Sequence, residues 1–479
     1  MFILSEDTER TRGDDAQSSN ISAGKAVSES VRTTLGPRGM DKMLVSDDGD
    51  VVITNDGATI LDEMDIEHPA AQMLVEVAET QEEEVGDGTT TASILAGELL
   101  SQAESLLEED VHPTTIVEGY HEASEIAQST IEEAVIATEP DDDQLLQVAK
   151  SSMTGKGTGD LGAEDLARTV VDAVSQVSTD SGVDRSAITV HTQVGATSSA
   201  TELVEGVIID EERLSEEMPA SVQDAQIAVV EDDLEIKEAN VDAEYQVSNV
   251  DQLNAAIEAE TGQLQQYAET LADTNADVVF VDGDIDDRLT ADLVGHGLLV
   301  FEDVDGDDIE AIRAATGASR VGSVDAIEDE DLGSAENVSV EKYGDDEMVF
   351  IEGGAASKAV TVFARGSTDH VVDELERSLK DALDVVTAAL DAGGVVAGAG
   401  AIEIEIADQI RDQAAGIEGR KQLAVEAYAD AIDVLPRTLA ENTGMDPIDA
   451  LVDLRAEHDS GATAGLISEG QTGIIADPI

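Results

Sequence analysis

The sequence contains no cysteine and no long apolar run. Without cysteine, disulfides, thiolate catalysis and cysteine-type zinc sites are all excluded. No stretch reaches the roughly 18 consecutive apolar residues that suggest a membrane-spanning helix. The first residues, Met1 to Asp7, lack the basic region and apolar core of a signal peptide. We therefore expect a cytoplasmic protein that does not bind membranes.

Positive charge is also scarce. Lysine and arginine total 25 against 107 aspartates and glutamates, which gives a net charge of −82. Binding of nucleic acid through a basic surface is excluded because phosphate neutralisation needs clustered cations, and adsorption to an anionic membrane is disfavoured for the same reason. Aromatic residues make up only 2%.

The acidic residues are spread along the chain, and apolar residues still make up 41% of it. This argues against a disordered polyanion and for a folded protein with an acidic, solvated surface. Such a surface repels itself at low salt, but molar salt shortens the Debye length to about 3 Å. We infer a halophilic cytoplasm. At about 150 residues per domain, 479 residues suggest three domains.

The two ends of the chain read as helical and the middle as mixed. Val45 and Val51 flank an Asp/Gly turn typical of a hairpin, and long apolar-striped helices follow. Residues 227–230, 278–281 and 298–301 read as short buried strands separated by helices, with another strand near Val321. The chain is again mostly helical from His370, with a break at 393–400. The simplest architecture inserts a compact α/β domain into a helical one.

A glycine- and threonine-rich segment, Gly86-Asp87-Gly88-Thr89-Thr90-Thr91, precedes one of these helices. Two glycines permit close backbone approach, and the helix N-terminus favours an anion such as phosphate. Asp87 could hold Mg²⁺ beside those phosphates. A capped helix after a glycine turn explains the segment equally well.

Other segments are ambiguous when taken singly. Leu35-Gly36-Pro37-Arg38-Gly39 is either a nucleotide loop or an ordinary helix C-cap. Asp56 is either an Asx-turn residue or a catalytic carboxylate, and Asp381 reads as a surface acid on a charged helix. The glycines of 393–400 could form a phosphate platform or allow close helix packing.

Several common enzyme motifs are missing from the sequence. There is no P-loop, no His-Glu-x-x-His and no Gly-x-Ser-x-Gly elbow. The glycine run 155–159 follows no buried strand, so it is a weak dinucleotide fingerprint. Serine hydrolases, zinc hydrolases and P-loop enzymes therefore have little support.

As an ordered set, however, the segments are specific. Residues 33–44, 53–61 and 86–91 resemble the group II chaperonins, and most closely the archaeal thermosome subunits. The match continues through 152–157, 378–383 and 441–449 and covers essentially the whole chain in collinear order.

The resemblance implies a multidomain α and α/β fold. A mostly helical equatorial domain would comprise 1–137 and 394–479, and an α+β intermediate hinge 138–206 and 356–393. The inserted α/β apical domain would comprise 207–355, with a helical lid protrusion at about 240–272. The implied function is ATP-dependent folding of enclosed non-native proteins in a stacked double ring of identical or paralogous subunits, with lid closure driven by ATP hydrolysis.

The resemblance also assigns residues to roles and implies ATP and Mg²⁺ as cofactors, with K⁺ as a further candidate cation. Asp381 would be the general base, Asp56 would help to orient the attacking water, and Asp87 would hold Mg²⁺. Lys156 would belong to a loop that senses the terminal phosphate. The remaining nucleotide contacts would come from Leu35, Gly36, Pro37, Gly57, Gly88, Thr89, Thr90, Thr91, Gly398, Gly400 and Asp477.

The sequence departs from the family pattern at two places. Ala399 stands where the family usually has the middle of three glycines, and its methyl group is expected to crowd the nucleotide. After Asp477 the sequence stops, whereas the family continues through a helix and a strand, so we expect either a truncated or a divergent chain. These departures motivate an alternative function, a non-hydrolysing holdase or mixed-ring subunit. A small-molecule kinase is a more distant alternative.

Overall fold

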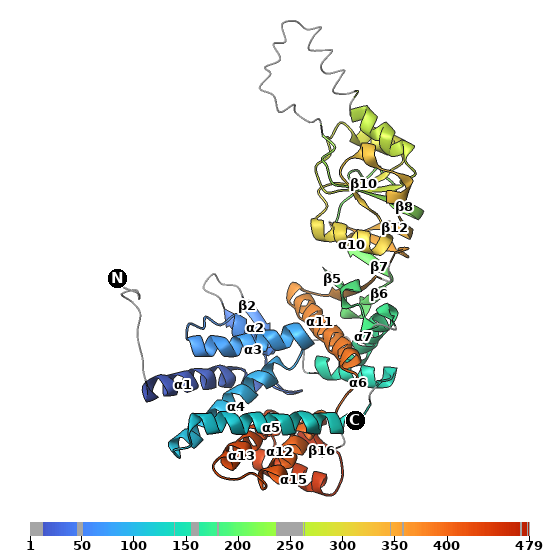
Figure 1. Ribbon diagram of the computed structural model, residues 1–479. Helices are drawn as coiled ribbons and strands as arrows, with labels where there is room; N and C mark the ends of the chain where they lie inside the picture. The colour runs from blue at the N-terminus through green and yellow to red at the C-terminus, as the bar shows by residue number, and fades with distance from the viewer. Residues whose placement is uncertain are drawn as a thin grey trace, which may run out of the picture. The chain divides into compact units, whose positions relative to one another are not determined.

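Figure 1 shows the computed structural model of the chain. It describes residues 13–45, 51–137, 139–154, 162–179, 182–235, 262, 264–344, 346–356, 359–469, 472–476 and 478. Two predicted nucleotide contacts, Lys156 and Asp477, lie outside the described residues, as does most of the predicted lid. Among the described helices, none has the length and apolar character needed to cross a membrane.

The chain divides into two compact units. The first consists of both ends, Met1–Thr158, Gly162–Val171 and Arg377–Ile479, and the second consists of Gly159–Leu161 and Asp172–Glu376. The insertion of the middle of the chain into a region formed by its ends is therefore seen in the structure. Two helices, α7 (Ala163–Val177) and α11 (Asp369–Ala392), run across the boundary between the units.

The first unit is mostly helical, and Figure 1 shows the N-terminal helices α4 and α5 beside the C-terminal helices α12 and α13. Its elements are α1 (Asp14–Val31), η1 (Arg32–Thr34), β1 (Lys42–Val45), β2 (Val51–Thr54), α2 (Gly57–Asp62), α3 (Pro69–Val85), α4 (Thr89–Glu108), α5 (Pro113–Ala134), α6 (Asp142–Met153), α12 (Ala401–Ala414), α13 (Lys421–Ile432), α14 (Val434–Asn442), α15 (Pro447–Asp459), β15 (Gly465–Glu469) and β16 (Thr472–Ala476). The predicted hairpin is present, with Lys42 opposite Thr54 in an antiparallel pair.

Local sequence explains where several of these helices begin. Proline occupies the first turn of α3, α5 and α15, where its missing N–H is not needed. The preceding residue caps each helix: the ring nitrogens of His68 and His112, and the carboxylate of Asp446, accept backbone N–H groups. Helix α6 begins with a capping box formed by Asp141 and Gln144.

The described part of the second unit is built on two main sheets and a short antiparallel pair, β3 with β4. Its larger sheet has the order β10-β9-β8-β12-β13-β7, with β11 paired to β8, and the smaller has the order β5-β14-β6. The elements are β3 (Ser178–Thr179), β4 (Gly182–Val183), η2 (Arg185–Ala187), β5 (Ile188–Val194), η3 (Ser198–Ala200), β6 (Glu202–Val204), β7 (Gly206–Ile209), β8 (Ser221–Val230), β9 (Val278–Val281), α9 (Thr290–His296), β10 (Leu299–Phe301), α10 (Gly306–Thr316), β11 (Arg320–Val321), η4 (Val324–Ala326), η5 (Asp329–Asp331), β12 (Gly333–Tyr343), β13 (Asp346–Glu352) and β14 (Val360–Gly366).

The predicted buried strands form the parallel part of the larger sheet. β8, β9 and β10 pair in parallel, and each has a completely buried run such as 278–281. Such continuous apolar runs are typical of strands covered on both faces. The antiparallel pair β12 and β13 was not predicted, because residues 333–343 are mostly small or polar and give no apolar run.

One boundary of the predicted lid needs correction. Residues 264–273 are helical, and the side chains of Leu264 and Leu271 are buried in the core cluster of the larger sheet. This part of the predicted amphipathic helix therefore packs against the sheet instead of protruding. The remainder of the predicted lid, up to residue 261, lies outside the described residues.

Candidate functional site

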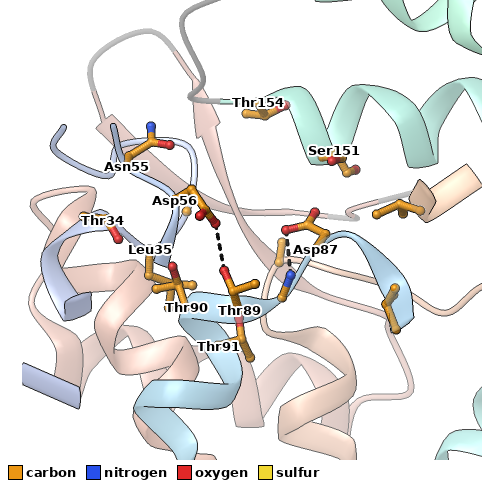
Figure 2. Close-up of a pocket in the computed structure, with 16 residues that line it drawn as sticks. Thr34, Leu35, Asn55, Asp56, Asp87, Thr89, Thr90, Thr91, Ser151 and Thr154 are labelled. Atoms are coloured by element: carbon orange, nitrogen blue, oxygen red, sulfur yellow. Dashed lines mark hydrogen bonds between the residues drawn. The ribbon is translucent and has the colours of Figure 1, made fainter. Parts of the chain in front are cut away.

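A cavity of about 470 Å³ opens in the first unit, where loops from distant parts of the sequence meet. Figure 2 shows Asp56, Asp87 and Thr89 gathered on one side, with Ser151 and Thr154 of α6 across from them. The lining residues are Thr34, Leu35, Gly36, Asn55, Asp56, Val85, Asp87, Gly88, Thr89, Thr90, Thr91, Ser151, Ser152, Thr154, Val385 and Ala399. The volume falls in the range of small-molecule sites, about 300–1,000 Å³.

The N-terminus of α4 forms one side of the cavity. Gly86 and Gly88 both have left-handed backbone, with φ of 77° and 83°, which allows the chain to turn tightly between α3 and α4. Thr89, Thr90 and Thr91 then form the first turn of α4 and line the cavity. The first N–H groups of a helix lack intrahelical acceptors and carry the positive end of the dipole. This side of the cavity can therefore bind an anion.

Asp56 joins the N-termini of two helices. Its Oδ2 accepts the Thr59 N–H at 2.7 Å and so caps α2, while its Oδ1 accepts the Thr89 hydroxyl at 2.9 Å. Asp56 is thus the helix cap that its turn sequence predicts. Its side chain also lines the cavity, so it can contact a ligand bound there as well as cap the helix.

Gly57 allows the two helix N-termini to approach each other. A Cβ at this position would lie 2.6 Å from the Thr90 hydroxyl oxygen and 2.8 Å from the Thr90 nitrogen. Any other residue would push α2 away from α4. Gly57 itself is buried and is not among the residues that line the cavity.

Asp87 lies in the turn before α4. Its Oδ1 accepts the Gly88 N–H at 2.7 Å, and its carbonyl oxygen accepts the Gln81 side chain at 2.8 Å. These bonds fix the turn and direct the carboxylate toward the cavity (Figure 2). Within the described part of the chain, no cluster of three or more acidic or histidine side chains could hold a metal on its own. One or two carboxylates suffice for Mg²⁺ when phosphate and water complete the octahedron, so this site fits Mg²⁺ only together with a phosphate ligand.

The loop after η1 forms a second side of the cavity. Leu35 and Gly36 line it, and Gly36 has left-handed backbone with φ of 83°. A Cβ on Gly36 would collide with the Leu439 side chain of α14. Pro37, one residue later, is half-buried and is not among the lining residues.

The glycine-rich segment before α12 contributes only its central residue. Ala399 lines the cavity, whereas Gly398 and Gly400 do not. Ala399 has φ of 57°, the left-handed region that favours glycine, so the departure from the family pattern falls at a strained position. Its carbonyl oxygen accepts the Leu466 N–H at 2.7 Å, which ties the segment to β15.

Helix α11 carries Asp381, the predicted base. Asp381 is buried, with 6% of its surface exposed, and it does not line the cavity, but Val385 one turn later does. A Cβ on Gly86 would collide with Asp384, so α11 lies directly against the turn that holds Asp87. The Arg377 guanidinium also donates to the Thr54 hydroxyl at 3.3 Å, two residues before Asp56.

Sequence reasoning missed several lining residues. Thr34 and Asn55 directly precede the predicted site residues Leu35 and Asp56, and this adjacency in the sequence was a signal that could have identified them. Ser151, Ser152 and Thr154 come from the end of α6, next to the glycine run that begins at Gly155. Their hydroxyl groups give no distinctive pattern in the sequence.

Comparison with known proteins supports the family resemblance that the order of the motifs indicates. The profile of the TCP-1/cpn60 chaperonin family matches residues 27–478. Thermosome subunit 3 of Haloferax volcanii is 61% identical over all of this chain and 92% of its own length. Thermosome subunit alpha of Halobacterium salinarum is 52% identical over 97% of this chain and 83% of its own length, and the thermosome subunit of Methanopyrus kandleri is 51% identical over 97% and 86%.

These relatives confirm the resemblance inferred from the sequence motifs and favour a chaperonin over the non-hydrolysing alternative. Two of them come from halophilic archaea, in agreement with the acidic composition. The match covers nearly all of the chain, including both units. The chain belongs to the TCP-1/cpn60 chaperonin family.

Proposed function

We propose that this chaperonin subunit binds ATP with Mg²⁺ in the cavity of the first unit and hydrolyses it to drive protein folding. One observation carries the proposal: the threonine-rich N-terminus of α4 and the carboxylates of Asp56 and Asp87 line a single cavity. A helix N-terminus attracts phosphate, and a nearby carboxylate can hold a divalent cation.

Binding and charge neutralisation would be divided among the lining residues. Gly88, Thr89, Thr90 and Thr91 would hold the phosphates, and Leu35 and Gly36 would contact the nucleotide through their backbone. Asp87 would hold Mg²⁺, which when bound neutralises charge on the phosphate oxygens. Phosphoryl transfer needs little covalent chemistry from the protein, so positioning and electrostatics dominate the rate. Further contacts are proposed for Pro37, Gly57, Lys156, Gly398, Gly400 and Asp477.

Asp381 would be the base that accepts a proton from the attacking water, with Asp56 orienting that water. The boundary between the two units falls inside α11, just before Arg377. Asp381 is therefore on the same continuous helix as residues of the second unit. A movement of the second unit that shifts α11 would move Asp381 relative to the cavity, which would couple hydrolysis to conformation.

The sheets of the second unit support the proposed domain plan. The smaller sheet combines β5 and β6 with β14, which is more than 150 residues later, as expected for a hinge built from two segments, 138–206 and 356–393. The larger sheet lies within 206–352, close to the proposed apical domain at 207–355. The equatorial domain would comprise 1–137 and 394–479.

We further propose that the chain assembles with identical or paralogous subunits into a stacked double ring in the cytoplasm and encloses non-native proteins. Haloferax volcanii has thermosome subunits 1, 2 and 3, at 52%, 47% and 61% identity to this chain. Several related subunits in one organism make a mixed ring the favoured assembly. Electron microscopy of the protein purified in molar salt tests for rings.

The decisive experiment compares two aspartate variants on the same helix. Asp381→Ala removes the proposed base, whereas Asp391→Ala removes an exposed carboxylate near the end of α11. We expect Asp381→Ala to bind ATP normally but to hydrolyse it at least about a hundredfold more slowly. Asp391→Ala should turn over at the wild-type rate. Normal hydrolysis by Asp381→Ala would show that the base is wrongly assigned.

A second comparison tests the metal. In wild-type protein, chelation of Mg²⁺ should abolish hydrolysis, and Asp87→Ala should lower both turnover and the affinity for the Mg²⁺ complex of ATP. Hydrolysis that continues without Mg²⁺ would contradict the proposed role of Asp87. Client refolding that proceeds equally without ATP would contradict the ATP-driven function as a whole.

A further inference from the structure

The C-terminal turn of α14 contacts three segments at or near the cavity, and two of them, the loop of Leu35 and Gly36 and the segment of Gly400, were predicted to bind nucleotide. Leu439 packs against Gly36 and, at 3.7 Å from the position of a Cβ, against Gly400. The Thr443 hydroxyl lies 2.5 Å from where a Cβ on Gly473 of β16 would be. Asn442 lies between these two residues and contacts the loop of Leu35.

Asn442 uses one amide nitrogen to hold two backbone carbonyls of this loop. Its Nδ2 donates to the Leu35 oxygen at 2.8 Å and to the Arg32 oxygen at 3.2 Å. Arg32 is the first residue of η1 and Leu35 is its C-cap, whose N–H already donates to the Arg32 oxygen at 3.5 Å. The Leu35 carbonyl lies past the helix end, where intrahelical donors run out, so Asn442 supplies its donor and adds a second one for Arg32. An amide NH₂ group has two hydrogens and can satisfy both acceptors at once.

The loop held in this way forms part of the cavity. Leu35 and Gly36 line it, and the chain then closes on itself through Gly39 N–H to the Gly36 oxygen at 2.8 Å and Met40 N–H to the Thr33 oxygen at 2.9 Å. The Leu439 side chain fills the space behind Gly36. The loop is thus braced from behind by Leu439 and fixed at its carbonyls by Asn442.

We propose that Asn442 is a positioning residue for nucleotide binding, which holds the Leu35–Gly36 backbone in its binding geometry before the nucleotide arrives. The inference rests on the proposed nucleotide function of the cavity. A preorganised loop avoids an ordering cost on binding, so loss of Asn442 should weaken affinity. Asn442 does not line the cavity, so turnover at saturating ATP should be preserved.

The matched control is Glu441, the preceding residue. Its carboxylate is half-exposed and contacts the Arg32 side chain at 3.7 Å. Asn442→Asp keeps the size of the side chain but places carboxylate oxygens against two carbonyl oxygens. Asn442→Ala removes the donor without adding repulsion. Glu441→Gln changes only the exposed charge.

Two measurements on the full-length protein in molar KCl test the inference. The first is hydrogen exchange without nucleotide, where the amides of Gly39 and Met40 should exchange about tenfold faster in Asn442→Asp. The second is steady-state ATP hydrolysis. Here KM should rise about tenfold in Asn442→Asp and about threefold in Asn442→Ala, with kcat within about twofold of wild type. Glu441→Gln should match wild type in both measurements.

The possible outcomes separate this inference from the proposed function. If wild type hydrolyses ATP and the Asn442 variants have an unchanged KM, or a lower kcat with unchanged KM, the positioning role is wrong. Unchanged amide exchange likewise overturns it. Suppose that the Gly39 and Met40 amides exchange faster in the Asn442 variants but that wild type neither binds nor hydrolyses ATP. The proposed function is then wrong, whereas the conclusion that Asn442 fixes the loop remains valid. Should Asn442→Asp not fold, Asn442→Ala decides by the same criteria.

Discussion

The second unit gathers most of the described core of its larger sheet in one large cluster beside a smaller one, whereas the described core of the first unit falls into several small clusters. In the second unit, the rings of Phe280 and Phe301 stack at 4.9 Å inside the sheet. In the first unit, the cluster between α12 and α13 is rich in alanine, which allows helices to approach closely. The unit that holds the cavity is thus the one whose described core is divided into smaller clusters.

This difference shows what a binding cavity requires of its surroundings. A single apolar core leaves no place for polar loops to meet, because a buried polar group without a partner costs free energy. Between separate helical clusters, loop ends and helix N-termini can meet and supply hydrogen-bond partners to one another. The Thr89 hydroxyl, for example, donates to the Asp56 carboxylate. In place of one core, the clusters are joined by polar contacts such as the ion pairs of Asp433 with Arg411 and Arg455.

The largest expected effect lies in the large cluster of the second unit. Phe301→Ala deletes a ring with no exposed surface and leaves a cavity beside Phe280. We expect the free energy of unfolding of the second unit to fall by about 3–5 kcal/mol. Hydrogen exchange of β8 and β9 during urea unfolding measures this change. Val452→Ala, a truncation at a 58% exposed position of α15, should change stability by less than about 0.5 kcal/mol. A loss below about 1 kcal/mol for Phe301→Ala would contradict the role of this large cluster in stabilising the second unit.

The next largest effect concerns the ion pairs between the helices of the first unit. The Asp433 side chain is 1% exposed and accepts hydrogen bonds from both Arg411 and Arg455, which are about one-third exposed. Asp433→Asn should destabilise the first unit by about 2–3 kcal/mol, below the range for fully buried pairs because the arginines can rehydrate. Urea unfolding followed by hydrogen exchange of α12 and α14 measures the loss.

The control uses the same arginine and a more exposed acid. Arg411 also pairs with Asp430 at 2.9 Å, but the Asp430 side chain is 55% exposed. Asp430→Asn should therefore cost less than about 1 kcal/mol. Equal losses for Asp433→Asn and Asp430→Asn would mean that burial does not strengthen the pairs that join the clusters.

A pH-dependent effect should appear in the second unit. Burial, and then the nearby charges of Asp308, Asp305 and Asp303, raise the pKa of Glu211 from 4.5 to about 7. The native state therefore binds the proton more tightly than the unfolded state, so this residue reduces stability as the pH rises from about 4.5 to 7. Glu211→Gln should remove that loss and gain on the order of 1 kcal/mol at pH 8, allowing for its half-exposed position and for screening by salt.

Urea unfolding at pH 5 and pH 8 measures the effect. The gain from Glu211→Gln should be present at pH 8 and nearly absent below pH 5. Glu212→Gln, at the exposed neighbouring position, should show no such dependence. A gain that is the same at both pH values would show that the pKa of Glu211 is not raised.

The smallest effect is expected beside the cavity. Ala399 adopts φ of 57°, which glycine tolerates better, so Ala399→Gly should stabilise the first unit by about 0.5 kcal/mol after the entropy cost of glycine is deducted. Ala397→Gly, at a position without left-handed backbone, should instead destabilise it by about 0.5–1 kcal/mol. Thermal unfolding of both variants checks the opposite signs. Two losses of equal size would show that Ala399 is unstrained.

Much of the candidate site could be predicted because its residues are consecutive. The hairpin, a helix opening at Ala58 and the helix after Gly88 follow from local turn and apolar patterns, and each is present, the first of the two helices beginning one residue earlier, at Gly57. The capping role of Asp56 also follows from its turn. In contrast, strand β12 was missed because its residues are mostly small or polar, and because one of the two strands that it pairs with, β8, is distant in the sequence.

The sequence alone determined the acidic character, the lack of disulfides, the order of the motifs and the family, because each of these is a property of composition or of linear spacing. Only the tertiary structure decided which motif residues face one cavity and which lie behind it. It placed Ala399 in the cavity instead of Gly398, buried Leu264, Ala268 and Leu271 in a core, and brought Asn442 to the carbonyl of Leu35. The physical reason is that such contacts depend on helix packing between segments about 400 residues apart, which no local pattern encodes.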